Sequence, residues 1–439
     1  MSERVIKVGL CGFGVVGQGV FNYLRSRQDL LSDRIGARLE VSRIAVRDTK
    51  KKRDFDYDES MLTTDPLSIA TDPEVDVVCE LMGGTGVALD VSIAALEAGK
   101  ILVTANKALL CDHGEAVFAA AKRGGGQLFF EASVAGGIPV IKALKDSLVV
   151  NRFSSIYGIL NGTSNYILTR MTNEGATYQE ILTEAKALGY AEADESLDVD
   201  GIDAAHKAVV LAYLAHGRWV PFKDLLVEGV SEVTQDDIQF AKDNGYAVKL
   251  LAVIDVAHAS GKLYISILPT LVSKKTSLGS VDGVFNAVSI HGDVVGETVY
   301  IGPGAGRDAT ASSVIADIVD GAKLLVNGGA ETFVDPAPRG GDAIELAEPE
   351  EIESRYYVRL QVLDKPGVMA EVASLLASHK VSLASVTQKE VGEGAESATL
   401  IVTTHMTNEK AILDSVKSLA ESPSVTAKPF CMPISGIEK

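Results

Sequence analysis

Cysteine is scarce in this chain, and its spacing excludes two common kinds of site. The four cysteines, Cys11, Cys79, Cys111 and Cys431, are widely separated and form no CxxC pair. This pattern is neither a zinc motif nor a disulfide framework, and it is typical of a reducing cytoplasm. The seven histidines, His206 among them, also lack metal-ligand spacing, and we interpret them as structural.

Basic residues and long apolar runs are scarce as well. The 41 Lys and Arg stand against 59 Asp and Glu, a formal net charge of −18, which argues against a nucleic-acid partner because such binding needs a Lys- and Arg-rich surface. No apolar run approaches the roughly 18 residues of a membrane span, and a first strand near Arg4 leads us to expect no secretory signal. The apolar fraction of 46% suits a folded chain, and 439 residues indicate two or three domains. We therefore expect a cytoplasmic enzyme or small-molecule-binding protein.

A glycine fingerprint lies near the start of the sequence. Gly12-Phe13-Gly14-Val15-Val16-Gly17 falls between a predicted strand at 5–10 and a predicted helix at 15–31. The first glycine permits a tight turn, the second lets the backbone approach a pyrophosphate, and the third lets helix and strand pack closely. An incidental glycine turn is the alternative, but the position between strand and helix favours a dinucleotide site.

Strands and helices continue to alternate after the fingerprint. Strands are predicted at 39–46, 75–80, 101–104 and 127–131, with helices at 88–98 and 114–122. This alternation predicts an α/β fold whose N-terminal Rossmann domain, residues 1–137, has a mainly parallel sheet. Ligands of such sheets gather at the carboxyl ends of the strands, where Thr104-Ala105-Asn106-Lys107 and residues 131–137 are expected.

The end of the second predicted strand bears on the choice of cofactor. Arg47 has the planar fork that pairs with the 2′-phosphate of NADP. Asp48 follows it and could instead bond the ribose hydroxyl of NAD. Lys50 to Arg53 fit a solvated basic loop about as well. We favour NADP, with NAD possible.

Several separated motifs resemble those of the homoserine dehydrogenase family, and together they span essentially the whole chain. They are Thr104 to Lys107, Asn161-Gly162-Thr163-Ser164-Asn165-Tyr166-Ile167, Leu188-Gly189-Tyr190-Ala191-Glu192-Ala193-Asp194, Asp198 to Lys207, and Gly302-Pro303-Gly304-Ala305-Gly306. The resemblance implies NAD(P)-dependent interconversion of L-homoserine and L-aspartate 4-semialdehyde, a step in threonine, methionine and isoleucine biosynthesis. It also implies an α+β catalytic and dimerisation domain over 138–301. Residues 302–335 are expected to return to the nucleotide domain, with Gly304 and Thr104 near the dinucleotide.

The acidic stretch before residue 207 suggests chemistry even without the resemblance. Asp203 and Lys207 lie at i and i+4 on one predicted helix face, although an ordinary surface salt bridge is the alternative. The resemblance implies that Lys207 is the general acid and that Asp203 orients its ammonium. It places Lys107 near both nicotinamide and substrate, assigns the substrate's α-ammonium group to Glu192, and gives Asp198 a supporting role.

A cation site is also implied by the resemblance. A monovalent cation, with sodium as the expected ion, would be held by Glu131 and by the backbone carbonyls of Val134, Gly136 and Ile138. Ligation by oxygen alone suits a hard cation and excludes zinc. The alternative is a glycine-rich connection that binds no ion.

A boundary rich in proline and glycine, at 336–341, precedes a C-terminal pattern of βαββαβ over 345–439. Asp364-Lys365-Pro366-Gly367-Val368 resembles the first turn of the ACT domain. That resemblance implies an amino-acid effector, with threonine expected, bound where two such domains pair. The alternative is a stabilising oligomerisation module. A homodimer or homotetramer is expected.

Two other functions compete with this interpretation. One is a different Rossmann dehydrogenase that acts on another small amino or hydroxy acid. The other is a non-enzymatic amino-acid sensor that keeps NADP as a structural cofactor. The set of Lys107, Glu192, Asp203 and Lys207 disfavours the sensor, because a sensor does not need these residues.

Overall fold

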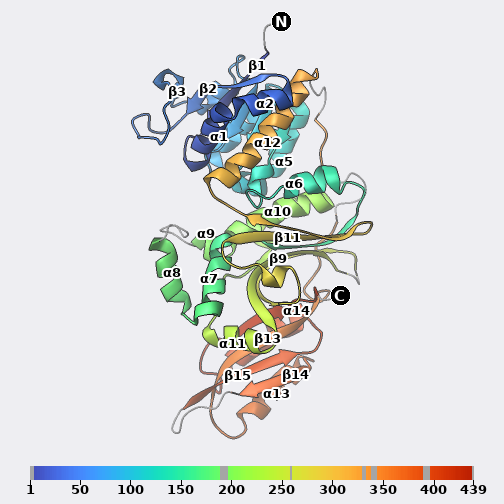
Figure 1. The fold of residues 1–439 in the computed structure, drawn as a ribbon. Helices are drawn as coiled ribbons and strands as arrows, with labels where there is room; N and C mark the ends of the chain where they lie inside the picture. The colour runs from blue at the N-terminus through green and yellow to red at the C-terminus, as the bar shows by residue number, and fades with distance from the viewer. Residues whose placement is uncertain are drawn as a thin grey trace. The chain divides into compact units, whose positions relative to one another are not determined.

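The computed structural model describes residues 4–187, 196–257, 260–328, 333–337, 344–388 and 396–437 (Figure 1). These residues form two compact units, each assembled from separate stretches of the chain. The first unit comprises Met1–Phe153, Ala205–Leu225 and Phe285–Asp342, and the second comprises Ser154–Ala204, Leu226–Val284 and Ala343–Lys439. Within the described part of the chain, no helix combines the length and the apolar character needed to cross a membrane.

The first unit is built around a parallel sheet with the strand order β3-β2-β1-β4-β5-β6. This is the order of a doubly wound dinucleotide-binding fold. Its elements are β1 Val5–Cys11, α1 Val15–Ser26, α2 Gln28–Ile35, β2 Arg38–Ala45, β3 Leu62–Thr63, α3 Pro66–Ala70, β4 Val77–Glu80, α4 Gly86–Glu97, β5 Ile101–Thr104, α5 Lys107–Gly124, β6 Gln127–Phe129, α6 Val140–Lys142, a π-helical turn at Ala143–Ser147, β11 Phe285–Gly292, β12 Gly296–Pro303 and α12 Arg307–Val326.

Successive side chains of the buried strands point to opposite faces of this sheet. Val77, Cys79, Ile101 and Val103 join the core formed with α1, α2 and α12. The helices α4 and α5 pack against each other on the opposite face. Helix α12 lies against α1, so a segment that follows β12 completes the nucleotide-binding fold. Burial on both faces explains why these strands read as continuous apolar runs.

Two predicted helices have different limits in the structure. The helix predicted at 15–31 is two helices, because Arg27 leaves the helical conformation between α1 and α2. The helix predicted at 114–122 begins earlier, at Lys107, where the side chain of Asn106 accepts a hydrogen bond from the backbone N–H of Leu109. An asparagine at this position satisfies a donor that a helix start otherwise leaves unpaired.

The second unit holds the C-terminal part of the chain and most of the residues that follow β6. Its elements are β7 Phe153–Ile159, α7 Gly162–Glu174, α8 Tyr178–Ala187, α9 Ser196–Val199, β8 Leu226–Val227, α11 Gln235–Asp243, β9 Tyr246–Val256, β10 Leu263–Ser273, β13 Glu353–Leu363, α13 Val368–Ser378, β14 Leu383–Gln388, β15 Ser397–Thr404, β16 Thr407–Asn408, α14 Glu409–Ala420 and β17 Phe430–Ile434. The helix α10 Ile202–His216 begins in the second unit and continues into the first.

One sheet joins the C-terminal region to the strands before it. Its order in this unit is β7-β9-β10-β17-β13-β15-β14. The junction is a parallel pairing of β10 with β17 at Leu271 and Ile434, and Leu263 exchanges backbone hydrogen bonds with Glu345 and Ala347. The order of the larger elements from β13 to β17 is the predicted βαββαβ order, and α13 and α14 pack with this sheet in a core of their own.

A buried carboxylate, Asp237 on α11, adds a second link to the C-terminal region. It is 0% exposed and accepts hydrogen bonds from the Tyr357 hydroxyl at 2.7 Å and from Arg359 Nε at 2.9 Å. Its other oxygen accepts from the backbone and hydroxyl of Thr234, which starts α11. A buried ion pair is costly to break, because the remaining charge loses its partner and its contact with water.

We therefore expect Asp237→Ala to lower the free energy of unfolding by about 3 kcal/mol or more. The measurement is chemical denaturation of the full chain. A matched control is Glu97→Ala, which removes the exposed ion pair between Glu97 and Arg123 and should cost less than about 1 kcal/mol. Equal, small losses in both variants would contradict the role given to Asp237.

Candidate active site

The glycine fingerprint of the first unit forms the tight turn expected between β1 and α1. Gly12 has a φ of 113°, and a Cβ there would lie 2.5 Å from the carbonyl oxygen of Leu81. A Cβ at Gly17 would lie 2.2 Å from the carbonyl oxygen of Gly12. Gly14, by contrast, has no atom within 4 Å of its ideal Cβ. Packing therefore explains the first and third glycines, whereas the second opens space at the N-terminus of α1, where an anion is favoured.

The basic loop after β2 is partly ordered against this fingerprint. Arg53 lies with its guanidinium 5.6 Å from the ring of Phe13 and 5.7 Å from that of Tyr57, and it donates to the carbonyl oxygen of Asp48. Arg47 is exposed at the end of β2. The carboxylate of Asp48 accepts from the backbone of Lys50. Arg53 is thus packed against aromatic rings, whereas Arg47 remains accessible to a ligand.

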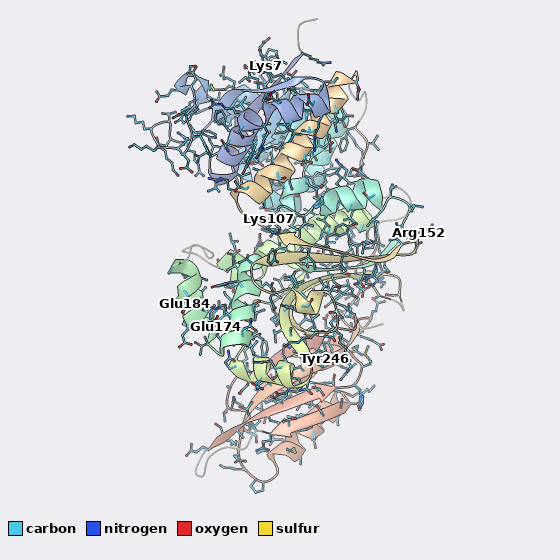
Figure 2. The ribbon with its side chains drawn as sticks, in the orientation of Figure 1. Lys7, Lys107, Arg152, Glu174, Glu184 and Tyr246 are labelled. Carbon is cyan, nitrogen blue, oxygen red and sulfur yellow. The ribbon has the colours of Figure 1, made fainter. Side chains whose placement is uncertain are left out.

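A buried network at the carboxyl ends of β4 and β5 positions the first residue of α5. The carboxylate of Glu80, 0% exposed, accepts from the Thr104 hydroxyl at 2.8 Å and from the backbone of Met82 at 2.9 Å. Thr104 Oγ1 in turn accepts from the backbone of Asn106, whose side chain caps α5. Burial raises the pKa of Glu80. The network fixes the helix start at Lys107, labelled in Figure 2, which is half-buried.

The segment predicted to hold a cation is buried in the first unit. Glu131 is 4% exposed and accepts from the backbone N–H groups of Ile141 and Lys142 at 3.0 and 2.8 Å. Burial raises the pKa of Glu131 to about 7. Asp317 lies beside it, since its carboxylate accepts from the backbone N–H of Glu131, and burial raises the pKa of Asp317 as well.

The backbone of this segment turns sharply next to the glutamate. Ala135 and Gly136 have φ values of 53° and 46°, in the left-handed region. The carbonyl oxygen of Gly136 accepts from the Ser313 hydroxyl at 2.7 Å. A carboxylate and the nearby carbonyls of Val134, Gly136 and Ile138 are the donor types that a hard cation prefers. The residues fit such an ion, because a cation here would offset the buried negative charge of Glu131.

Gly304 lies next to the same turn. A Cβ at Gly136 would lie 2.4 Å from the carbonyl oxygen of Gly304, and a Cβ at Gly304 would lie 2.0 Å from the side chain of Asn286. Gly136 therefore permits close packing on the backbone of Gly304, and Gly304 in turn leaves room for the side chain of Asn286. This packing fixes the residues that lead from β12 into α12.

In the second unit, the side chain of Asn161 joins two carboxylates at the start of α7. Its Nδ2 donates to Asp198 at 2.8 Å and to Asp203 at 2.9 Å. Its Oδ1 accepts from the backbone N–H of Ser164 and so caps the helix. Thr163 donates to the second oxygen of Asp198 at 3.1 Å. One neutral amide thus bridges Asp198 and Asp203.

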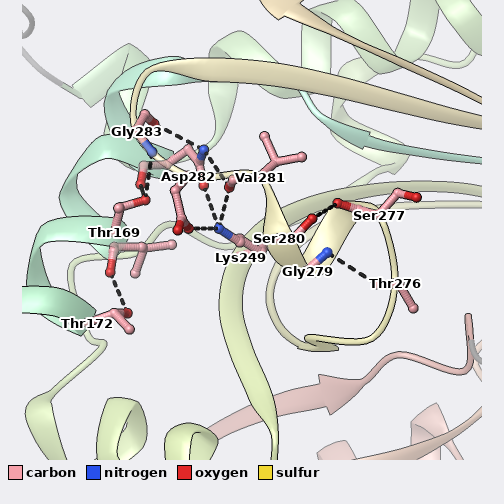
Figure 3. A network of polar contacts seen from close by, with 12 residues as sticks. Thr169, Thr172, Lys249, Thr276, Ser277, Gly279, Ser280, Val281, Asp282 and Gly283 are labelled. Carbon is pink, nitrogen blue, oxygen red and sulfur yellow. Dashed lines mark hydrogen bonds and ion pairs between the residues drawn. The ribbon is translucent and has the colours of Figure 1, made fainter.

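A buried lysine fixes the next turn of α7 (Figure 3). Lys249 on β9 is 2% exposed, and its ammonium donates to Asn165 Oδ1 at 3.1 Å, to the carbonyl oxygen of Val281 at 2.5 Å and to Asp282 at 3.2 Å. Asn165 donates to the carbonyl oxygens of Val281 and Gly283. Burial lowers the pKa of Lys249. The helix that carries Asn161 is therefore anchored to the residues that follow β10.

Helix α10 carries the remaining candidates. Asp203 and Lys207 are 9% and 8% exposed, so neither belongs to an ordinary surface salt bridge. The helix begins at Ile202, which places Asp203 in its first turn. Glu192 lies outside the described residues. Asp198 and Asp203 are brought together with Asn161, and the expectation for Glu192 stays a prediction.

Sequence reasoning gave no role to four of the side chains that shape these sites: Glu80, Asn106, Asn161 and Lys249. Glu80 and Lys249 had a signal, since a charged residue in or at the end of an apolar strand is unusual. The two asparagines had the weaker signal of a cap residue directly before a helix. Their second role, as donors to specific distant groups, has no local signature.

A Rossmann sheet with an open glycine turn, joined by α10 to a second unit with buried carboxylates, defines the class of NAD(P)-dependent oxidoreductases. Family profiles for homoserine dehydrogenase, its NAD-binding domain and the ACT domain match residues 139–319, 12–131 and 356–421. The chain is 42% identical to a homoserine dehydrogenase from Pseudomonas aeruginosa and 38% identical to one from Bacillus subtilis, covering 95% of each protein. The chain belongs to the homoserine dehydrogenase family.

Solved structures confirm the predicted fold class. A homoserine dehydrogenase from Thiobacillus denitrificans matches with a TM-score of 0.88 and 37% identity, over 99% of both chains. A hyperthermophilic archaeal homoserine dehydrogenase in complex with NADPH matches 72% of this chain and 98% of its own, with a TM-score of 0.61 and 27% identity. The α/β architecture with a Rossmann domain and a C-terminal ACT domain is thus confirmed.

The double role of Asn161 leads to a sharp prediction. Asp caps a helix as well as Asn does, so Asn161→Asp keeps the cap of α7, removes the donor that Asp198 and Asp203 share and adds a third negative charge beside them. We expect kcat/KM to fall by about 10-fold or more, since a hydrogen bond to a charged group contributes about 1.5–3 kcal/mol. The matched control is Asn408→Asp, because Asn408 caps α14 in the same way. Steady-state kinetics and denaturation are measured on both variants. If kcat/KM of Asn161→Asp equals that of the unmodified chain, the shared donor has no role in the site.

Proposed function

We propose that this chain is an NAD(P)-dependent homoserine dehydrogenase that interconverts L-homoserine and L-aspartate 4-semialdehyde. The observation that supports this most directly is a dinucleotide fold and a lysine buried on α10, in a chain whose full-length relatives carry this name. A nicotinamide cofactor, when bound, supplies or accepts the hydride. The protein must bind the amino acid, orient its carbonyl and transfer one proton.

Lys207 is the proton donor in this proposal. In the direction of semialdehyde reduction its ammonium protonates the developing alkoxide, and in the reverse direction its neutral amine accepts the hydroxyl proton. Asp203 lies one turn earlier on the same helix and orients this ammonium. Its carboxylate is itself held by Asn161. Lys107, at the start of α5, provides a second cationic group for the oxygen.

The substrate's amino group requires acidic partners. We assign its α-ammonium to Glu192, with Asp198 in support. Both side-chain oxygens of Asp198 already accept hydrogen bonds, from Asn161 and Thr163. Its contribution is therefore to hold its segment in place and to add negative charge, with direct binding left to Glu192.

Lys207→Ala should lower turnover by roughly 100-fold or more, the usual scale for removing a general acid. Binding of NADPH, followed by fluorescence titration, should change little. Lys223→Ala removes an exposed lysine of the same unit and serves as the control. Glu192→Ala should act instead on the KM for homoserine. Near-normal turnover of Lys207→Ala would exclude the proton-transfer role.

For the cofactor we propose NADP, with NAD as a second substrate. Arg47 is exposed after β2, whereas Arg53 is packed against Phe13. Arg47 is therefore the side chain that pairs with the 2′-phosphate. Thr104 and Lys107 complete the binding surface at the ends of β5 and α5.

Arg47→Ala should raise the KM for NADPH and leave NADH use unchanged, because only NADP carries the phosphate. Arg53→Ala is the contrasting variant and should impair both cofactors, since it removes packing beside the fingerprint. Both KM values are compared by absorbance assays. Equal losses with the two cofactors in Arg47→Ala would give Arg47 a structural role instead.

A monovalent cation, sodium in our proposal, would be held by Glu131 and by the carbonyl groups of Val134, Gly136 and Ile138. Its contribution would be to neutralise buried charge and to hold the segment between β6 and α6.

We also propose that the chain forms a homodimer or homotetramer. The support is an apolar surface of Val149, Val150, Val294 and Val295, which are exposed by 74%, 72%, 67% and 49%.

The C-terminal domain is proposed to bind an amino-acid effector, threonine, that inhibits the enzyme. The described contacts supply a physical connection for such inhibition. Arg359 on β13 holds Asp237 on α11, and Gln235 on the same helix donates to the carbonyl oxygens of Met171 and Ala176 at the end of α7. The opposite end of α7 carries Asn161. Inhibition requires that threonine bind one state of these elements better than another.

Gly367, in the first turn of the C-terminal domain, provides a test of this regulation in the full chain. It has a φ of 96° and no atom within 4 Å of its ideal Cβ, so Gly367→Val adds bulk and strain where the effector should bind. Gly36→Val is the matched control, since Gly36 has a φ of 76° and equally open surroundings in the first unit. We expect the threonine concentration for half inhibition to rise about 10-fold or more in Gly367→Val alone. If the unmodified chain resists threonine and related amino acids, the domain is an oligomerisation module.

A further inference from the structure

Three potential metal ligands meet between α5 and α10 of the first unit. They are Cys111, Asp112 and His206, and their ligand atoms all lie within 4.8 Å of one another. Cys111 is buried, His206 is half-buried and Asp112 is exposed, so the group is reached from the solvent side. No other such group occurs among the residues that the structure describes. Sequence spacing gave no sign of it, because the two helices are far apart in the chain.

A break in α5 accompanies this arrangement. Neighbouring residues of a regular helix do not face each other, yet the ligand atoms of Cys111 and Asp112 are both near His206. The next residue, His113, has φ and ψ of −133° and 17°, outside the helical range. On the other helix, the ring of His206 lies 5.6 Å from that of Phe222. The break thus directly follows the two ligands on α5, and the ring contact lies at the ligand on α10.

We propose that Cys111, Asp112 and His206 bind a thiophilic divalent cation of the zinc type, and that this cation inhibits the dehydrogenase. A thiolate, an imidazole nitrogen and a carboxylate are three of the usual protein ligands of zinc, with water in the fourth position. Bond lengths of about 2.0–2.3 Å place tetrahedral ligands about 3.6 Å apart. The three ligand atoms lie within 4.8 Å of one another, and rotation of the exposed Asp112 and the half-buried His206 side chains can bring them to the tetrahedral separation.

Charge balance favours an exchange of the cation for a proton. An ordinary cysteine thiol carries a proton at neutral pH, whereas zinc binds the thiolate. Binding of Zn²⁺ releases this proton and forms the thiolate, and the site gains one net positive charge. A metal that replaces a proton in this way gives affinity that increases with pH.

The inhibitory effect follows from the position of the ligands and rests on the proposed role of Lys207. His206 directly precedes Lys207 on α10, and Cys111 lies one turn after Lys107 on α5. A metal that joins α5 to α10 at these positions restrains the helix segments that carry Lys107 and Lys207. A restrained lysine loses the geometry that proton transfer requires, and a small displacement of a reacting group slows a reaction sharply.

Cobalt is the probe for binding, because a thiolate–cobalt bond absorbs in the near ultraviolet whether or not the enzyme is active. Untagged, metal-free full-length protein is titrated with Co²⁺, and Zn²⁺ is then added to displace it. We expect one equivalent of absorbing cobalt in the unmodified chain. The band should be missing in Cys111→Ala and should need about 10-fold more metal in His206→Gln. Cys431→Ala is the matched control and should keep the band, since Cys431 lies on β17 of the second unit.

Activity is measured in parallel with zinc in place of cobalt. Zinc should inhibit the unmodified chain and Cys431→Ala. Inhibition of Cys111→Ala should need a zinc concentration about 10-fold higher or more. A missing band in the unmodified chain, or an unchanged band in Cys111→Ala, would overturn the site. If Cys111→Ala does not fold, His206→Gln decides the same question. If the metal binds specifically but does not inhibit, the metal site stands and its link to Lys207 is wrong. The dehydrogenase assay with Lys207→Ala tests the proposed function separately.

Discussion

The amide of Asn161 is the interaction on which the second unit's candidate site depends. Two carboxylates, Asp198 and Asp203, lie within hydrogen-bond distance of the same nitrogen. Like charges at this separation repel, and burial makes the repulsion stronger. A neutral donor lowers this cost without neutralising either acid. The oxygen of the same amide caps α7. The start of this helix and the two carboxylates therefore keep one position relative to each other.

Other buried charges of this chain are held by the same means. Glu80 accepts from a hydroxyl and a backbone N–H, and Lys249 donates to an amide oxygen, a carbonyl oxygen and a carboxylate. An unsatisfied buried charge would cost far more than such hydrogen bonds contribute. Each of these groups therefore restricts the elements around it to one arrangement. Rigid positioning of this kind is what a hydride-transfer site requires, since small displacements of reacting groups reduce the rate sharply.

The C-terminal region is part of the second unit's sheet. The pairing of β10 with β17 and the Asp237–Arg359 ion pair connect it to the strands and helices that position α7. The strand that precedes its first turn therefore contacts α11, and α11 contacts α7. The pattern of residues 345–439 predicted the order of its elements, because period-two apolar alternation and helical periodicity are local properties. The shared sheet was not predicted, since the pairing partner of an edge strand depends on residues far away in the sequence.

The sequence by itself determined the class of fold, the dinucleotide turn and the family, because these depend on local patterns. Gly12 and Gly17 need no side chain for steric reasons that their spacing already expresses, and β5 occupies the predicted residues 101–104. Tertiary structure decided the break at Arg27 and the burial of Lys207. It also decided which distant groups meet: Asn161 with two carboxylates, Lys249 with Asn165, and Cys111 with His206. The physical reason is that a side chain's periodicity fixes the face it occupies, whereas its partner is fixed only when two elements pack together.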